Sequence, residues 1–488
     1  MRRSTKHELY WLLGMFILFF LISIFIRPVG DDWETGPLRH FQWTILLPND
    51  RFWRPFEEIY RVLIGHAPWV YPWLNHLLVA SAHVLTAYCL YHLCDYFKIN
   101  KPIKIGVILY FLFSPFAMGT VMTVDAWTQA FAELWGILSV LVYFRNTGIK
   151  RYLLWIICCI MAVFTKESGI VWFIVTPLLF FVLKIDTFSS IFKKENVSKI
   201  AFPIIVGAAF AVMYFILREL LLPSGTNIGV DNPNSRYHVS ILSVRLFRNL
   251  CMIIGGCFTS FDSVALFYHP RNWLLAGITI ILNIPFLILT GYLFVKAFSD
   301  KQKIGKILIL IIILLIVSSP HLIVQVGEMH VYPSLVISAI ILGMLYSGIE
   351  YSPKTYMVLT AFVISAFISN IHKWIGAYTG GQTGYEIALD IKEKTTVEPN
   401  KVLLICVRYD EQQYSSFGIP AYAAFNLGNS AEALYKYQYP KLFKKFIIKD
   451  GDESFIEKQV NNIIQSETEK YDCIWIVNRT NVKVINNE

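Results

Sequence analysis

The chain has 488 residues, of which 55% are hydrophobic and 16% are charged, and its formal net charge is +9. This composition excludes a water-soluble globular protein and predicts a chain that crosses a membrane several times. The positive charge does not indicate a nucleic-acid partner, because most basic residues lie in short segments between apolar runs, where they determine membrane orientation.

Eleven apolar runs predict transmembrane helices, for which about twenty residues suffice to cross a bilayer. The predicted spans are 9–26, 72–97, 106–124, 127–144, 152–165, 170–183, 200–217, 273–294, 307–319, 332–347 and 356–371. Basic residues before the first span place the N-terminus in the cytoplasm, and no small-residue cleavage site follows, so we expect this span to be retained. The chain is therefore predicted to lie in the cell (inner) membrane with its C-terminal tail extracytoplasmic.

A further apolar run, 250–266, is ambiguous. If it crossed the membrane, the lysines between positions 296 and 306 would lie outside, against the rule that basic loops stay in the cytoplasm. We therefore expect this run to be amphipathic or re-entrant on the outer side.

The predicted fold class is an all-α polytopic membrane protein with a small C-terminal α/β domain. The transmembrane domain covers 1–375 and includes a first extracytoplasmic loop, 28–71, and an outer segment, 219–271. The first loop is rich in Trp, Phe and Arg, which is typical of helices that lie in the membrane interface.

The soluble extracytoplasmic domain is predicted at 398–488. Apolar runs at 401–407 and 473–477 predict buried strands, and 453–464 predicts a helix between them. Cys406 and Cys473 lie in these strands and form a candidate disulfide if the compartment is oxidising. No cysteine or histidine spacing indicates a metal site.

Asp31 and Asp32 directly follow the first span, at the predicted outer surface. One interpretation is that they only end the helix. The other is that one carboxylate acts as a general base and its neighbour orients a substrate, because partial desolvation raises the pKa and basicity of a carboxylate. The sequence does not choose between the two residues.

Other polar and charged residues gather in the outer halves of the spans and in the outer segments. They include Arg54, Asn75, His83, Lys166, Glu167, Arg245, Arg248 and His330. A basic cluster beside an acidic pair suits a site that binds a lipid phosphate and carries out acid–base chemistry. Anchoring to anionic headgroups is the alternative for the basic residues, and hydrogen bonding between helices is the alternative for Asn75 and His83.

Several short strings in 8–350 resemble the GT-C superfamily of polyprenyl-phosphate-sugar-dependent glycosyltransferases. The resemblance is strongest to the protein O-mannosyltransferase-like group that includes the transmembrane and tetratricopeptide-repeat proteins. The strings are Asp31-Asp32, Arg54-Pro55-Phe56, Asn75 with His83, Ser114-Pro115, Lys166-Glu167-Ser168-Gly169, Asp231-Asn232-Pro233 followed by Arg245, and Glu328 before Tyr332-Pro333-Ser334.

The resemblance implies a GT-C-like, hexosyltransferase-like enzyme that moves a sugar from a polyprenyl-phosphate carrier to an extracytoplasmic protein, lipid or cell-surface glycan. Its partners are then membrane lipid, the lipid-linked sugar donor and the acceptor. No cofactor is required, and a divalent metal is not demanded by the chemistry although the sequence leaves one open.

By position, the resemblance implies that Asp31 or Asp32 is the catalytic base. The residues implied in binding the lipid phosphate or the sugar are Arg54, Asn75, His83, Lys166, Glu167, Arg245, Arg248, Glu328 and His330. The chain departs from the group at Gly119, which follows a string where an acidic residue is usual, and at His330, which replaces an arginine. These departures keep two alternatives open, namely a lipid-linked-glycan transporter and a catalytically inactive membrane scaffold.

Overall fold

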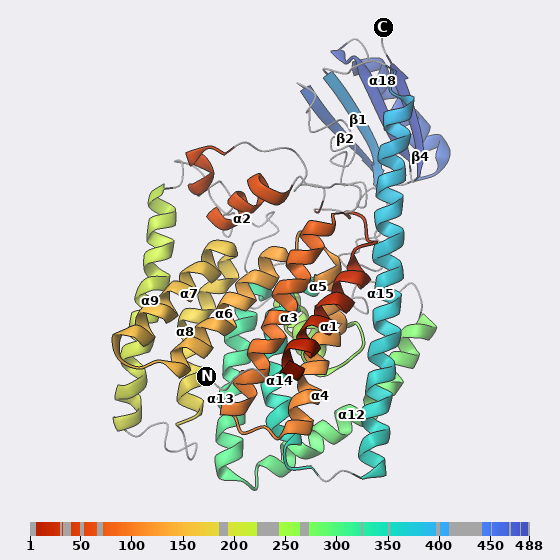
Figure 1. Ribbon diagram of the computed structural model, residues 1–488. Coiled ribbons are helices and arrows are strands. Elements are labelled where there is room, and N and C mark those ends of the chain that lie inside the picture. The colour runs from red at the N-terminus through yellow and green to blue at the C-terminus, as the bar shows by residue number, and fades with distance from the viewer. Residues whose placement is uncertain are drawn as a thin grey trace.

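The computed structural model is mainly helical, with a small sheet at the C-terminal end of the chain (Figure 1). It describes residues 6–29, 32, 41–48, 53–65, 72–184, 194–221, 244–263, 273–323, 326–349, 352–396, 401–408, 442–449, 451–467, 470–478 and 480–486. Asp31 and the string 231–233 therefore lie outside the described residues.

A helix, or a bent pair of helices, forms at each of the predicted spans. These are α1 (Lys6–Ser23), α3 (Trp73–Tyr96), α4 (Lys101–Phe113) with α5 (Pro115–Met122), α6 (Trp127–Arg145), α7 (Gly148–Thr165), η4 (Glu167–Val171) with α8 (Trp172–Val182), α9 (Lys194–Leu221), α12 (Trp273–Ala297), α13 (Lys301–Leu322), α14 (Glu328–Tyr346) and α15 (Pro353–Lys394).

Within the described ranges, seven helices are long and apolar enough to cross a membrane, and an eighth span results if α4 and α5 are counted together. The helices α1, α6 and α8 occupy predicted spans but do not meet this test of length and hydropathy. The chain is thus a multi-pass membrane protein.

The break between α4 and α5 follows from Ser114-Pro115. Proline has no N–H to donate and disfavours helical backbone in the residue before it, and Ser114 is indeed extended at ψ 135. The two helices meet at a bend of 46°. Asn370 of α15 donates its side-chain amide to the Phe113 carbonyl at 2.8 Å, which satisfies an acceptor that the break leaves open.

Short helices form in the first loop, as its composition predicts. They are η2 (Trp43–Leu46), α2 (Pro55–Tyr60) and the π-helical turn η3 (Arg61–Gly65). Figure 1 shows α2 lying across one end of the bundle.

The apolar run 250–266, whose membrane crossing was ambiguous, begins within α10 (Val244–Phe258). This helix is 15 residues long and is not among the described helices that could span the membrane, as expected.

The C-terminal domain contains strands β1 (Lys401–Arg408), β2 (Leu442–Lys449), β3 (Cys473–Asn478) and β4 (Asn481–Asn486), with helix α18 (Glu453–Glu467). The sheet order is β2-β1-β3-β4, and β1 is parallel to both of its neighbours while β4 is antiparallel to β3. The predicted strands β1 and β3 and the predicted helix are confirmed. The candidate disulfide is not formed, because Cys473 lies opposite Val402, four residues away from Cys406.

Helix α15 joins this sheet to the bundle. The prediction ended its last span at residue 371, but the helix has 42 residues and continues to Lys394. Its last turns bury Ile387, Ala388 and Ile391 in one core with strands β1 and β3. Figure 1 shows the sheet at the same end of the bundle as α2.

Candidate functional site

Asp32 is held at the end of the bundle by backbone N–H groups. Its Oδ1 accepts from the Asp125 N–H at 2.6 Å, and its Oδ2 accepts from the Val29 N–H at 3.1 Å. The residue is 2% exposed. Burial, followed by the nearby charge of Asp125, raises its pKa to about 7 against the lowering effect of these hydrogen bonds. Asp32 can therefore gain or lose a proton near neutral pH.

Tyr60 lies near enough to this carboxylate to feel its charge, and Asn75 is its hydrogen-bond partner. The Tyr60 hydroxyl donates to Asn75 Oδ1, and its ring stacks on Trp127 with 3.9 Å between ring centroids. Burial, with the charges of Asp32 and Asp125, raises the pKa of the Tyr60 hydroxyl, which therefore stays neutral. Asn75, a predicted site residue, thus joins α3 to α2, which fits the structural alternative for this residue.

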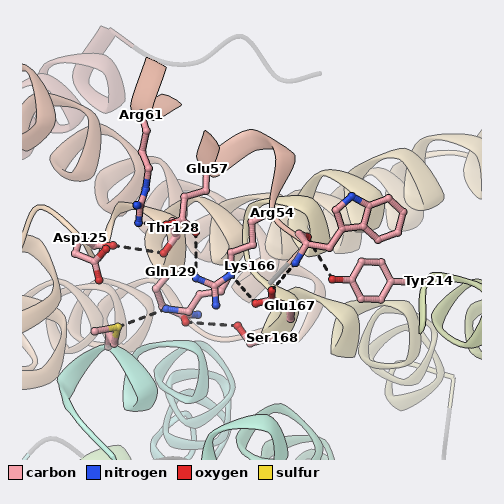
Figure 2. Close-up of polar contacts among 12 residues, drawn as sticks. Arg54, Glu57, Arg61, Asp125, Thr128, Gln129, Lys166, Glu167, Ser168 and Tyr214 are labelled. Atoms are coloured by element: carbon pink, nitrogen blue, oxygen red, sulfur yellow. Dashed lines mark hydrogen bonds and ion pairs between the residues drawn. The ribbon is translucent and has the colours of Figure 1, made fainter. Parts of the chain in front are cut away.

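An ion-pair network joins α2 to the loop after α7 (Figure 2). Arg54 Nε lies 2.6 Å from Glu167 Oε2, and a guanidinium nitrogen of Arg54 lies 3.0 Å from Glu57 Oε2. Arg61 completes the network at 2.5 Å from Glu57 Oε1. Burial opposes the ionisation of Glu57, but the two arginines outweigh it and hold its pKa below the ordinary value. Two predicted site residues, Arg54 and Glu167, are thus partners of each other.

Lys166 lies next to this network but has a different partner. Its Nζ contacts Met329 Sδ at 3.4 Å, and within the described ranges no ion pair joins it to a carboxylate. Burial and then the charge of Arg54 lower its pKa to about 8. The carboxylates of Asp125, Glu57 and Glu167 act on Lys166 from a distance and favour its charged form, but they do not outweigh these two effects.

His330 follows Met329 in the first turn of α14. Its Nδ1 accepts from the Gly327 N–H at 2.8 Å, and its ring lies 5.4 Å from that of His321 at the end of α13. The electric fields of Lys166 and His321 act on His330. His330 was predicted as a site residue from its position, whereas His321 was missed because it lies within an apolar run.

The other predicted site residues make structural contacts. His83 is buried, with Nδ1 at 2.9 Å from the Tyr332 hydroxyl and Nε2 at 3.2 Å from the Leu112 carbonyl. Glu328 lies 2.8 Å from Lys373, which also pairs with Asp262 at 2.7 Å. Both arrangements tie helices together.

The predicted arginines of the outer segment lie on α10. Arg245 donates to the Ile323 carbonyl at 3.3 Å, just beyond the end of α13, and Arg248 is one turn further along the same helix. Asn249 donates to the Leu322 carbonyl at 2.7 Å. This segment therefore supports the end of α13 that carries His321. In the part of the chain that the structure describes, no group of three or more His, Cys, Asp or Glu side chains is arranged to hold a metal ion.

No protein-family model and no curated protein matches this chain. Among solved structures, it is similar to ArnT from Cupriavidus metallidurans bound to undecaprenyl phosphate, with 11% identity over 99% of this chain and 98% of that chain and a TM-score of 0.48. It is also similar to the Archaeoglobus fulgidus oligosaccharyltransferase in the apo form, with 14% identity over 90% of this chain and 65% of that chain and a TM-score of 0.41.

Proposed function

We propose that this protein is a membrane glycosyltransferase of the GT-C type that transfers a sugar from a polyprenyl-phosphate carrier to an acceptor hydroxyl outside the cytoplasm. The observation that carries the proposal is the position of Asp32, a buried carboxylate with a pKa of about 7, at the same end of the bundle as Lys166, which forms no ion pair with a carboxylate among the described residues. The order of short strings in the sequence supports the same class. The sugar is proposed to be a hexose, and the acceptor a protein, lipid or cell-surface glycan.

In this mechanism Asp32 is the general base. The acceptor oxygen forms a bond to the anomeric carbon, and its proton passes to the Asp32 carboxylate. The bond between the anomeric carbon and the phosphate oxygen breaks, and its electron pair stays on the phosphate. A direct displacement of this kind inverts the anomeric centre. A base with a pKa near the working pH is well matched to the proton transfer.

Lys166 stabilises the charge that grows on the leaving phosphate. Its ammonium is free of carboxylate ion pairs within the described ranges, whereas Arg54 is neutralised by Glu57 and Glu167. A cation fixed in place before the reaction needs no reorganisation as charge develops, which is why such groups are often the largest contribution to catalysis. Arg54 is thus proposed to fix the loop that presents Lys166.

The test is turnover of a panel of labelled polyprenyl-phosphate sugars by the purified protein in lipid nanodiscs. Asp32→Asn is expected to lower turnover by about 10²–10⁴-fold, the range typical of a lost general base. Asp31→Asn is the matched control and is expected to keep turnover, provided that both variants have the same melting temperature as the wild type.

Three other outcomes are informative. Loss of turnover in Asp31→Asn alone would make Asp31 the base. Full turnover in both variants would remove the acidic pair from the mechanism. Unchanged lipid binding, without transfer or hydrolysis of any donor, would favour the transporter or the inactive scaffold instead.

A further inference from the structure

An exposed apolar surface lies on the first loop, around the short helix η2. It consists of Phe41, Trp43 and Leu47, which are all exposed, and the exposed fraction of Trp43 is 77%. The rings of Phe41 and Trp43 meet edge to face with 5.3 Å between their centroids. Leaving such side chains in water costs about 25 cal/mol for each Å² of apolar area. A contiguous surface of this kind therefore indicates a partner.

Trp53 attaches this surface to α9. Its indole N–H donates to the carbonyl of Leu46, the last residue of η2, at 3.0 Å. Its ring stacks on Tyr214 of α9 with 5.4 Å between centroids, and the Tyr214 hydroxyl donates to the Trp53 carbonyl at 3.3 Å. Trp53 itself is buried. The exposed surface is therefore held beside the C-terminal part of α9.

The C-terminal end of α9 shows how far the lipid-facing surface extends on this side of the bundle. The segment Ile200–Leu221 is long and apolar enough to span a membrane, and its last residues, Leu220 and Leu221, are exposed. They lie beyond Tyr214, so the lipid-facing surface continues for about two turns, or about 10 Å, past the stacked rings. Figure 1 shows that α9 reaches the level of α2 at this end of the bundle.

Lipid is the partner that these observations favour. The lipid-facing surface of α9 adjoins η2, and the exposed neighbours of the apolar side chains, Gln42 and Thr44, carry no charge that would favour an ionic partner. Trp, Phe and Leu are the side chains with which interfacial segments enter a membrane. Helix α2 does not offer such a surface, because none of its residues is exposed.

We propose that Phe41, Trp43 and Leu47 insert into the membrane leaflet on the side of Asp32 and anchor the first loop to the lipid surface. An interfacial tryptophan keeps its indole N–H within reach of the headgroups while its ring lies against the acyl chains. The interaction requires no charge on the lipid, so a bilayer of phosphatidylcholine alone is sufficient.

The anchor is connected to the candidate site. The Trp53 backbone N–H donates to Glu167 Oε1 at 3.2 Å, and Arg54 pairs with the other oxygen of the same carboxylate at 2.6 Å. Lys166 precedes Glu167 in the chain, so the anchor sets the depth at which the Lys166 ammonium meets the carrier phosphate. This consequence rests on the proposed function, whereas the insertion itself does not.

Tryptophan fluorescence of the full chain in phosphatidylcholine nanodiscs tests the insertion. The emission of Trp43 is the difference between the wild type and Trp43→Phe. Its quenching is measured with phosphatidylcholine brominated near the top of the acyl chains and, separately, with iodide in the water phase. The brominated lipid is expected to remove about half or more of this emission, and iodide almost none. Trp475→Phe is the control, because Trp475 lies in the core of the sheet domain and should respond to neither quencher.

Sugar transfer tests the connection between the anchor and Lys166. Trp43→Asp places a charge in the leaflet, which is costly, and is expected to raise the KM for an undecaprenyl-phosphate sugar several-fold. A donor with a water-soluble chain of two isoprene units does not depend on the membrane, so its KM should stay unchanged. Trp43→Leu keeps an apolar side chain and should retain the wild-type KM for both donors. All variants are compared at equal melting temperature.

Quenching of Trp43 by iodide but not by brominated lipid would place the surface in water and overturn the inference. Protection from both quenchers would overturn it as well, since a protein, such as a second copy of this chain, would then cover the surface. An equal rise in KM for both donors would separate the anchor from the depth of Lys166. The fluorescence measurement uses no sugar donor, so its result does not depend on the proposed function, which Asp32→Asn tests separately.

Discussion

Asp32 and Lys166 are two ionisable side chains of opposite charge whose pKa values are both displaced toward neutrality. Burial raises that of Asp32 to about 7 and lowers that of Lys166 to about 8. In the proposed mechanism the Asp32 carboxylate must be ionised, and the Lys166 amine, which binds the phosphate, must be protonated. Both conditions hold together only in a narrow interval of pH, between the two values.

We therefore expect a bell-shaped dependence of kcat/KM on pH, which rises through about 7 as Asp32 loses its proton and falls above about 8 as Lys166 loses its charge. Lys166→Arg should move the falling limb to higher pH, because arginine stays charged, and leave the rising limb in place. A rate that is flat from pH 6 to pH 9, or a falling limb that does not move in Lys166→Arg, would show that these two groups do not control the reaction.

At the scale of single elements, the sequence predicted the helices and strands that local residue patterns specify. It did not predict those that are stabilised by contacts with distant parts of the chain. The run 401–407 is apolar at nearly every position, so the buried strand β1 was evident. Strand β2 was missed because Lys444, Lys445 and Lys449 dilute its apolar residues. The full length of α15 was missed because its second half, with several glycines, has weak helical propensity and is stabilised by packing on the sheet.

The residues of the candidate site likewise divide into those that the local sequence identifies and those whose role depends on tertiary contacts. Arg54, Lys166 and Glu167 could be selected from the sequence, because charges next to apolar runs are costly and so carry information. Glu57 and His321 could not, since Glu57 resembles any exposed residue of an amphipathic helix and His321 lies in an apolar run. Their roles depend on Arg54, Arg61 and His330, which come from other elements or other turns.

The ion pairs of Lys373 hold three elements together. Its amine is 0% exposed and lies between Asp262, which follows α10, and Glu328, at the start of α14. Lys373→Met should destabilise the protein by about 3–5 kcal/mol, because it removes the ammonium that pairs with two buried carboxylates. The matched control is Lys394→Met on the same helix, where the exposed pair with Asp390 contributes at most about 1 kcal/mol. Thermal unfolding in detergent measures both, and equal melting temperatures would contradict the prediction.

At the scale of the whole molecule, α15 connects the C-terminal sheet to the segment that leads to Asp32. The Trp374 indole donates to the Ile22 carbonyl at 2.7 Å, and the Arg27 guanidinium lies 3.7 Å from the ring centroid of Tyr385. Between them, Gly381 allows the backbone of Arg27 to approach closely, since a Cβ at this position would lie 2.6 Å from the Arg27 carbonyl oxygen. The end of α1 is therefore set by its contact with α15.

Gly381→Ala should accordingly displace Arg27 and the segment that leads to Asp32, and lower kcat by up to about 100-fold, the effect of misplacing a reacting group by roughly 1 Å. Gly277→Ala is the matched control, because nothing lies within 4 Å of a Cβ at that position of α12. Sugar transfer at equal melting temperature distinguishes the two. If both variants turn over at the same rate, the contact between α15 and α1 does not position Asp32.

Helix α15 also sets the distance between the C-terminal sheet and the segment that leads to Asp32. Gly381 lies against Arg27, between α1 and Asp32, and Ile391 lies in the core of the sheet domain. Ten residues of α-helix rise about 15 Å. Because the sheet packs directly on α15, its distance from Asp32, the proposed base, is set by the length of this helix. An acceptor bound to the sheet would then be selected by its length. An acceptor molecule too short to span the distance from the sheet to Asp32 could not place its hydroxyl there, however tightly it bound.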